Sequence, residues 1–429
     1  MTKPGYKMTE IGEIPEEWGI CKFSEIAETV KGSVPKDKSN DEEGIKMYPY
    51  LSADYLRDNK KKTQYFKIDN RKTNQIVNMN ESILICDGSN AGEFFIGKEG
   101  ILSSTMVKLV FKDFSVMPKF TYYYMKIKEG TLKNTVKGST IPHISEDSLL
   151  NLNILLPPMK EQQKITDILS IADEAIQKVN EEITLTEKLK KGLMQTLLTI
   201  GIGHTKFKMT EMGEIPEEWN IGSLSSVSEN ENGIVAGPFG SNLKVSDYTN
   251  MGIPIIRLQN IASNSFIYKD IKYISEGKAE ELNYHSFIAG DIVLAKLGDP
   301  IGVSCIIPPN LPRGIVVADV VRIRVSKKKV DKRFVVQSLN SPICLQQLKS
   351  TKIGSTRPRV NLSDVRDMKM ILPDLQEQEK IAEILSAADN KLELLRNKKT
   401  YLERIKKGLM NDLLTGKVRV NINTSEGEN

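Results

Sequence analysis

The chain has 429 residues, of which 39% are hydrophobic and 27% charged, and its 60 basic and 55 acidic side chains give a net charge of +5. This length exceeds what one hydrophobic core usually organises, so two moderate domains are expected. The small positive balance excludes a histone-like binder and only weakly favours an anionic partner. No apolar run approaches the roughly 20 residues of a membrane span, which predicts a cytoplasmic protein.

Cysteine and histidine are too scattered to indicate a metal site. The four cysteines form no C-x-x-C pair, and the three histidines are isolated from one another. They are Cys21, Cys86, Cys305, Cys344, His143, His204 and His285. We therefore predict neither a structural zinc nor a disulfide framework.

The most informative feature is an internal repeat. KMTEIGEIPEEWGI at residues 7–20 returns as KMTEMGEIPEEWNI at residues 208–221, and the segment at 156–199 returns at 372–415. The stretches between these pairs match weakly, and the distance between the copies grows along the chain, as it does when surface loops gain insertions. So long a period indicates domain duplication and not a solenoid.

The constant segments predict two long helices. Apolar residues recur at three- and four-residue steps, as in a coiled-coil seam. The predicted seam residues are Ile165, Leu169, Ala172, Ile176, Val179, Ile183, Leu193 and Leu197 in the first helix, and Ile381, Leu385, Ala388, Leu392, Leu395, Leu402, Leu409 and Leu413 in the second. Each helix could simply pack within its own domain. Antiparallel pairing is favoured because an unpaired seam of this length would expose much apolar surface.

Polar residues interrupt both seams. Thr186 and Lys190 do so in the first helix, and Lys399 and Lys406 in the second. This pattern predicts that the far half of each helix pairs loosely or is covered by partner subunits.

The variable segments, residues 1–155 and 202–371, predict mixed α/β domains. Short runs rich in β-branched and aromatic residues alternate with turn residues, and helical stretches at 119–128 and 333–340 would cover the resulting sheets. Tyrosines at positions 122 to 124 suggest base stacking, but on a helix at least one of these rings must belong to the core.

Two equivalent loops, KGSTIPHIS at 137–145 and IGSTRPRVN at 353–361, are the best binding candidates. Their hydroxyl, imidazole and cationic groups suit phosphate or base edges. The candidate residues are Lys137, Ser139, Thr140, His143, Lys352, Ser355, Thr356, Arg357 and Arg359. A plain turn before a strand would explain the glycines and prolines but not the two arginines.

The second variable segment offers four further candidates, Lys244, Arg257, Gln259 and Asn260. For these, hydrogen bonds to the local backbone are an equally good explanation. Arg322 and Arg324 add to the basic residues of this segment. A basic variable domain joined to helices without a net charge excess would suit binding to nucleic acid.

Motifs for catalysis are missing. GEFFIGKE at 92–99 has the spacing of a phosphate-binding loop, but Glu99 stands where a hydroxyl is required and the second copy lacks the match. No dinucleotide fingerprint, Asn-Pro-Pro-aromatic motif or nuclease-like carboxylate–lysine cluster stands out. The chain is expected to bind and position, and not to catalyse.

The order of these segments resembles the specificity subunit of type I restriction-modification systems. The resemblance rests on the doubled GEIPEEW and LPPMKEQQKI-type segments, and GPFGSNLK and GDIVLAKLG in the second copy are similar to that family's target-recognition domains. It covers essentially the whole chain.

The resemblance implies two α/β target-recognition domains, residues 1–155 and 202–371, held by a pseudo-twofold frame. Two conserved helices, 156–201 and 372–417, would pair as an antiparallel coiled coil. Residues 418–429 would form a flexible tail.

The resemblance also implies a function. Each domain would read one half of a bipartite, asymmetric DNA site, and the helices would set the unread spacer. The subunit itself would be non-catalytic, with S-adenosylmethionine, ATP and magnesium belonging to two adenine methyltransferase subunits and two motor-nuclease subunits. The alternative is a coiled-coil scaffold that does not bind DNA by sequence.

Overall fold

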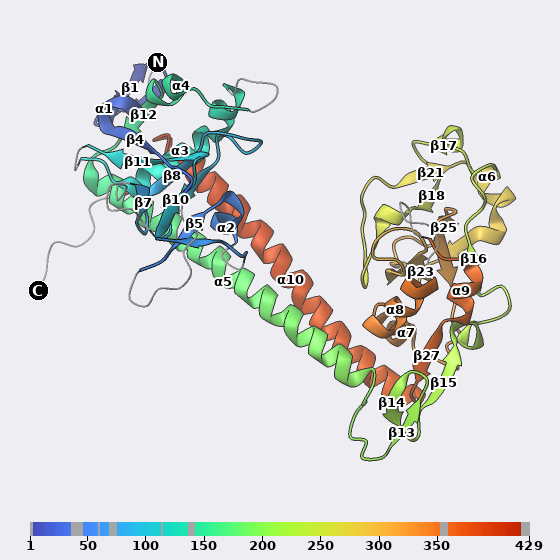
Figure 1. Cartoon of the computed structure of the whole chain (residues 1–429). Coiled ribbons are helices and arrows are strands. Elements are labelled where there is room, and N and C mark those ends of the chain that lie inside the picture. The colour runs from blue at the N-terminus through green and yellow to red at the C-terminus, as the bar shows by residue number, and fades with distance from the viewer. Residues whose placement is uncertain are drawn as a thin grey trace, which may run out of the picture. The chain divides into compact units, whose positions relative to one another are not determined.

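The computed structural model describes residues 3–35, 46–58, 61–67, 75–112, 115–135, 142–351 and 359–421. The chain forms two compact units, Met1–Val179 with Lys398–Asn429, and Asn180–Asn397. Two 39-residue helices, α5 (Met159–Leu197) and α10 (Leu375–Leu413), each contribute to both units (Figure 1). Among the described residues, no helix combines the length and apolar character of a membrane span.

The first unit contains two four-stranded sheets and a small hairpin. One sheet has the order β4 (Ala27–Lys31), β11 (Met106–Phe111), β8 (Ser82–Ile85), β9 (Phe94–Ile96), and the other β6 (Tyr65–Phe66), β5 (Tyr48–Leu51), β10 (Gly100–Leu102), β7 (Ile76–Val77). Two pairs complete it, β1 (Tyr6–Thr9) with β2 (Gly12–Pro15), and β3 (Gly19–Lys22) with β12 (Asn153–Leu156). Its other helices are α1 (Phe23–Ile26), α2 (Ala53–Arg57), α3 (Pro118–Asn134) and α4 (Glu146–Leu150).

The second unit has the same plan. Its sheets have the orders β16 (Ile234–Ala236), β26 (Val320–Ile323), β23 (Ile292–Ala295), β24 (Ser304–Ile306), and β17 (Tyr248–Thr249), β21 (Lys272–Ile274), β18 (Ile253–Ile256), β25 (Arg313–Val316), β22 (Ser286–Ile288). Its pairs are β13 (Phe207–Thr210) with β14 (Gly213–Pro216), β15 (Asn220–Ser223) with β27 (Lys369–Leu372), and β19 (Ile261–Ala262) with β20 (Ser265–Phe266). Its α-helices are α6 (Glu276–Glu281), α7 (Lys332–Leu339), α8 (Pro342–Thr351) and α9 (Leu362–Asp367), with 3-10 turns at Leu224–Val227, Val245–Asp247, Leu258–Asn260 and Asn283–His285.

Corresponding strands pair in the same way in the two units. β11 lies antiparallel between β4 and β8, just as β26 lies between β16 and β23. β5 pairs in parallel with β10, as β18 does with β25. The predicted duplication of one α/β fold is confirmed, although the sequences of these strands match only weakly.

A buried polar contact anchors the start of each long helix. The Trp18 indole, at the end of the first IPEEW motif, donates a hydrogen bond of 2.9 Å to Oε2 of Glu161 on α5. Trp219, at the end of the second motif, donates one of 2.8 Å to Oε2 of Glu377 on α10. A buried carboxylate is destabilising unless its oxygens are hydrogen-bonded, and each unit places a second partner beside the indole.

The second partner of the carboxylate differs between the units. Nε and Nη2 of Arg419 each donate to Glu161 at 2.9 Å, whereas Nε2 of His204 lies 3.0 Å from both carboxylate oxygens of Glu377. Arg419, near the start of the predicted flexible tail, thus contacts a buried partner, and the flexibility of residues 418–429 stays a prediction. Residues 422–429 lie outside the described residues.

The long helices pack antiparallel within each unit. In the first unit Lys406 of α10 forms an ion pair with Asp173 of α5, and in the second Lys190 of α5 forms one with Asp389 of α10. The two pairs are equivalent under the repeat, with the roles of the helices exchanged. Lys190 and Lys406 therefore do not stand unpaired in the seam, because each meets an aspartate of the opposite helix, and coverage of this half by partner subunits stays a prediction.

The predicted seam residues line the buried side of both helices, and none of them is exposed. Nine are fully buried, namely Ile165, Leu169, Val179, Leu197, Ile381, Leu385, Leu392, Leu395 and Leu413. The others are partly buried. Packing against neighbouring side chains, more than intrinsic helix propensity, therefore stabilises the helices.

We predict that Glu161→Ala lowers the free energy of unfolding of the first unit by about 3 kcal/mol, because it leaves Trp18 and Arg419 without their buried acceptor. The chain has two tryptophans, so Trp219→Phe, which also removes the Trp219–Glu377 hydrogen bond of the second unit, leaves Trp18 as the only tryptophan in a urea titration and serves as the common background for both variants. Glu17→Ala is the matched control, since Glu17 accepts from the same Arg419 at 2.8 Å but is largely exposed. The control should change stability by less than about 1 kcal/mol. Equal effects would contradict the anchoring role of Glu161.

Candidate nucleic-acid interface

Loops of the second unit converge at the end of its two sheets. The Gly237 amide, just after β16, donates to the Val320 carbonyl at 3.0 Å, and the Val317 amide, just after β25, donates to the Ile256 carbonyl at 3.1 Å. A side chain on residue 237 would collide with the carbonyl oxygen of Val317, so the close approach requires glycine.

The segment after β23 joins the same edge. The Lys296 amide donates to the Asp319 carbonyl, and the Val360 amide to the Lys296 carbonyl, both at 3.0 Å. Leu297 and Arg359 form an antiparallel bridge beside them. We call this set the second loop edge. It comprises residues 237–243, 257–260, 296–300, 317–319 and 359–360.

The first unit builds an equivalent edge. The Gly32 amide donates to the Met106 carbonyl at 3.0 Å, and the Gly88 amide to the Pro142 carbonyl at 2.9 Å. Asp87 and His143 form the bridge that corresponds to Leu297 and Arg359. We call this set the first loop edge. It comprises residues 32–35, 52–54, 87–90, 103–105 and 142–143.

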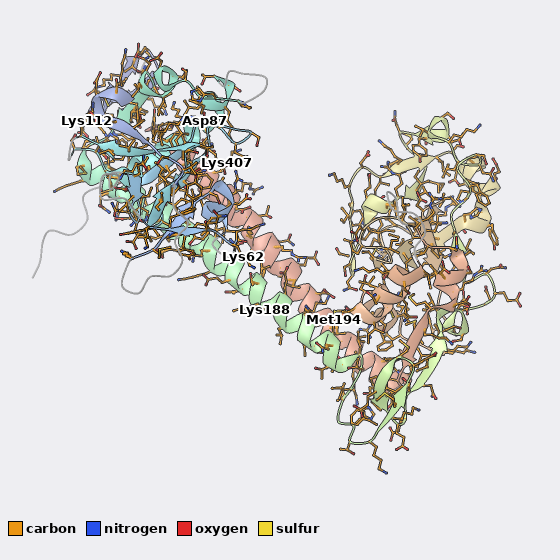
Figure 2. All side chains as sticks on the ribbon, viewed as in Figure 1. Lys62, Asp87, Lys112, Lys188, Met194 and Lys407 are labelled. Atoms are coloured by element: carbon orange, nitrogen blue, oxygen red, sulfur yellow. The ribbon has the colours of Figure 1, made fainter. Side chains whose placement is uncertain are left out.

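Charged groups at the first loop edge are paired with one another. Lys31 Nζ lies 3.0 Å from Oδ2 of Asp87, and Nδ1 of His143 contacts Oδ1 (Asp87 is labelled in Figure 2). Burial alone would raise the pKa of Asp87, but hydrogen bonds from His143 and Lys31 lower it below its ordinary value. His143 is thus oriented by Asp87 while remaining half-exposed.

The second loop edge presents different chemistry at the same backbone positions. Leu297 replaces the aspartate and Arg359 replaces the histidine. Arg359 is exposed and forms no ion pair with the described residues. Its guanidinium therefore remains available for a carboxylate, a phosphate or a base edge.

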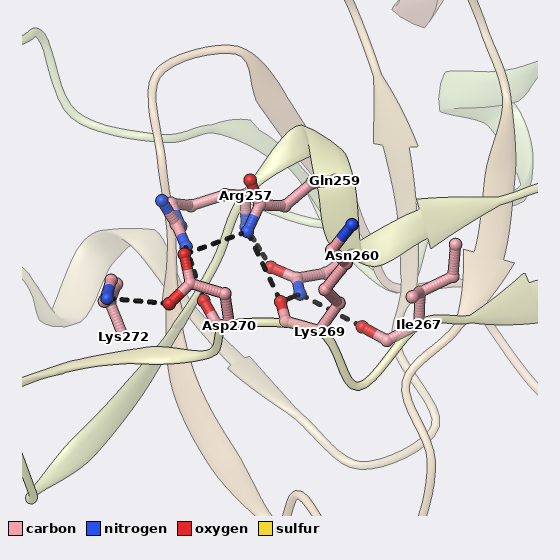
Figure 3. Close-up of polar contacts among 7 residues, drawn as sticks. All are labelled: Arg257, Gln259, Asn260, Ile267, Lys269, Asp270 and Lys272. Atoms are coloured by element: carbon pink, nitrogen blue, oxygen red, sulfur yellow. Dashed lines mark hydrogen bonds and ion pairs between the residues drawn. The ribbon is translucent and has the colours of Figure 1, made fainter. Parts of the chain in front are cut away.

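Arg257 and Gln259 belong to an ordered polar cluster (Figure 3). Nη2 of Arg257 donates to Oδ2 of Asp270 at 2.9 Å, Lys272 Nζ lies 2.7 Å from Oδ1, and Gln259 donates to the Lys269 carbonyl at 3.3 Å. Hydrogen bonds from Lys272 and then Arg257 lower the pKa of Asp270 to about 2. The carboxylate consequently stays ionised near neutral pH and holds its two cationic neighbours in place.

Asn260 does not reach the surface. Its amide nitrogen donates to the carbonyls of Ile267 at 3.0 Å and Lys269 at 2.9 Å, and its Oδ1 accepts from the Arg257 amide at 3.0 Å. The prediction that Asn260 contacts a ligand is wrong, because all of these bonds hold the loop from within.

A groove of about 410 Å³ at the second loop edge is lined by two of the candidate residues, Arg257 and Gln259. Its lining residues are Pro238, Gly240, Leu243, Tyr248, Arg257, Leu258, Gln259, Val317, Ala318 and Asp319. Lys244 is exposed and follows Leu243 of this groove in the chain. Its backbone amide donates a hydrogen bond of 2.7 Å to Oδ2 of Asp247. Seven candidates lie outside the described residues, and their roles remain predictions. They are Lys137, Ser139, Thr140, Lys352, Ser355, Thr356 and Arg357.

Arg322 and Arg324 are engaged within the second unit. Arg322 is buried and donates to the Asn232 carbonyl at 3.0 Å, while the partly exposed Arg324 makes two hydrogen bonds of 2.8 Å to the buried Asp291. The prediction that Arg322 adds to a basic binding face is wrong, because its side chain is buried, and the charge of Arg324 is paired with Asp291.

The row of tyrosines at 122–124 is also internal. Tyr123 and Tyr124 are buried in the core of the first unit, and Tyr122 packs against it. Tyr123 donates to Asp173 at 2.7 Å and Tyr124 to the Asn153 carbonyl at 3.2 Å, and burial raises the pKa of Tyr124 to about 12. These rings support the long helix and are not available for base stacking.

The segment at 92–99 and the buried cysteines of the second unit show no sign of a catalytic role. The phosphate-loop spacing at 92–99 runs through β9, and Lys98 Nζ donates to the Tyr55 carbonyl at 3.2 Å. Burial raises the pKa of Cys305 to about 12 and that of Cys344 to about 11, so neither thiol is poised as a nucleophile.

Two units of one fold with different donors at equivalent loop edges define a two-headed recognition protein. Residues 15–187 and 216–404 match the family described as the type I restriction modification DNA specificity domain, and the chain belongs to that family.

Relatives match along nearly the full length. The type I restriction enzyme MjaVIII specificity subunit of Methanocaldococcus jannaschii is 36% identical over 95% of this chain and 94% of its own. The putative MjaX specificity subunit of the same organism is 29% identical over 97% of each chain. The solved S subunit from M. genitalium covers 96% of this chain and 99% of its own with a TM-score of 0.59 at 17% identity, which shows a common fold.

We predict that Asn260→Ala destabilises the second unit by about 2 kcal/mol, because it removes three hydrogen bonds, to the carbonyls of Ile267 and Lys269 and from the Arg257 amide. Urea unfolding of the Trp18→Phe variant, in which Trp219 is the only tryptophan, would measure this. Asn242→Ala, an exposed position on the neighbouring loop, should change stability by less than about 0.5 kcal/mol. A stable Asn260→Ala variant would return this residue to the list of ligand contacts.

Proposed function

We propose that this chain is the DNA-recognition subunit of a type I restriction-modification complex, with each loop edge reading one half of a bipartite, asymmetric site. The observation that carries the proposal is the replacement of Asp87 and His143 by Leu297 and Arg359 at equivalent backbone positions. Two identical edges would suit a symmetric site, whereas edges with different donors suit two different half-sites.

The second loop edge supplies groups that read DNA. Arginine bonds guanine through two acceptors, and glutamine bonds adenine through a donor and an acceptor, so Arg359, Arg257 and Gln259 are suited to base edges in the major groove. Lys244 suits a phosphate. At the first loop edge, Asp87 would accept from cytosine while orienting His143, which gives that half-site a different preference.

Partner subunits would bind two grooves, one in each unit, that are lined by equivalent residues of the long helices. A groove of about 660 Å³ in the second unit is lined by Lys190, Met194 and Leu392, and one of about 490 Å³ in the first unit by their equivalents Lys406, Met410 and Ile176 (Met194 and the nearby groove residue Lys407 are labelled in Figure 2). A partner that recognises one groove fits the other. This supports two copies of a methyltransferase subunit and, by the same symmetry, two motor-nuclease subunits.

In this proposal the chain positions DNA, and the chemistry belongs to its partners. S-adenosylmethionine would serve the methyltransferase subunits, which methylate adenine, and ATP with magnesium would serve the nuclease subunits. The helices α5 and α10 would set the unread spacer, because each helical turn adds about 5.4 Å along the axis.

The test is genome methylation in cells that express this chain together with its methyltransferase, compared with cells that lack the chain. We expect a split, asymmetric motif with adenine methylated in both halves. If a stable complex forms but no new motif appears, the chain is a scaffold without sequence-specific recognition.

We predict that Arg359→Ala weakens binding of the complex to a duplex carrying that motif by about 1 to 3 kcal/mol. If the guanidinium reads a base, discrimination falls at one position of one half-site; if it contacts a phosphate, the salt dependence of binding decreases instead. Fluorescence anisotropy over a range of salt concentrations distinguishes the two.

Arg313→Ala is the matched control. Arg313 begins β25, at the end of the strand remote from the second loop edge, and its guanidinium lies 2.6 Å from Glu276. The control should leave affinity unchanged. Equal losses from both substitutions would mean that the effect is one of overall charge, and unchanged affinity of Arg359→Ala would remove this residue from the interface.

A further inference from the structure

An apolar side chain projects from each loop edge at the same place. Phe239 is 83% exposed and Val34 is 62% exposed. Each follows by two residues a glycine that is clamped against the turn between two strands, Gly237 in the second unit and Gly32 in the first. Single exposed apolar side chains are common, but these two occupy equivalent positions of the two loop edges, among the candidate DNA-contacting residues, and this shared placement points to a ligand.

The loop that carries Phe239 is anchored on both sides. The Gly237 amide donates to the Val320 carbonyl at 3.0 Å, and Leu243 is buried in the core beneath the loop. Between them the Asn242 amide donates to the Phe239 carbonyl at 2.8 Å, which closes a turn. The fold therefore buries one apolar residue of this loop and presents the other, so the exposed position of Phe239 is built into the loop.

We propose that Phe239 is an intercalating wedge, which enters between two adjacent base pairs of the half-site read by the second unit and unstacks them. This rests on the proposed DNA-recognition function and deepens it. Apolar wedges of this kind kink the duplex, and the bend brings more protein surface into contact with DNA. Val34 would act in the same way, but with less contact area, in the other half-site.

The surroundings of Phe239 favour DNA over a protein partner. Its neighbours Pro238 and Gly240 line the same groove as Arg257 and Gln259, whose polar groups suit base edges and phosphates. In the adjoining cluster, Arg257 and Lys272 both pair with the carboxylate of Asp270. An exposed ring beside a groove that offers a guanidinium and an amide fits a stack of bases flanked by phosphates better than an apolar protein pocket.

The test uses the full-length chain in complex with its methyltransferase, and duplexes carrying the motif defined by genome methylation. 2-Aminopurine is placed in turn at each step of the half-site read by the second unit, since its fluorescence rises when the base is unstacked. The wild-type complex should raise fluorescence at one step. Phe239→Ala should abolish that rise and weaken binding on the order of tenfold, whereas Phe239→Leu should retain most of both.

Met209→Ala is the control, because Met209 is 79% exposed but lies in the constant hairpin, on β13. It should behave as wild type. Specific binding without a fluorescence rise at any step, or a rise that survives Phe239→Ala, would overturn the wedge and leave the recognition function intact. Loss of the methyltransferase from the Phe239→Ala complex would assign the ring to a protein contact instead. A wild-type complex that does not distinguish the motif from a scrambled duplex would refute the recognition function and the wedge together.

Discussion

The structure depends on a buried tryptophan–glutamate contact at the start of each long helix. Trp18 and Trp219 close the two IPEEW motifs, and each donates to a buried carboxylate, Glu161 or Glu377. Such a carboxylate is destabilising unless it is fully hydrogen-bonded, so the hairpin, the helix and the second partner of the carboxylate, Arg419 or His204, must assemble together. The most strongly repeated residues of the chain are thus those that fix a helix to the unit from which it starts.

The tryptophan–glutamate contact is the same in both units, whereas the loop edges differ. The same glycine clamps, strand pairings and bridges recur in both units, while the side chains at the bridge change from Asp87 and His143 to Leu297 and Arg359. This division assigns stability to the repeated residues and recognition to the variable ones, which is where loops on a rigid scaffold usually carry function. A new specificity can then arise without rebuilding the core or the helices.

Much of this architecture could be predicted because repeats and hydrophobic periodicity are local signals. The duplication, both helices and the α/β class follow from them. Contacts between distant segments could not be predicted: a lysine in an apolar seam, such as Lys406, looks like an interruption until Asp173 is placed opposite it. The repeat of both residues, as Lys190 and Asp389, was a usable signal. Nothing in the sequence distinguished the buried Asn260 from its neighbour Gln259, because local hydrogen bonding decides between them.

If the two units are equivalent, each reads its half-site independently of the other. The most direct test replaces residues 23–155 with a copy of residues 224–371, so that both ends of the frame carry the second loop edge, and maps adenine methylation in cells that express the variant with its methyltransferase. The asymmetric motif should become an inverted repeat of the half-site read by the second unit. A motif that stays asymmetric, or in which the second half-site also changes, would contradict it.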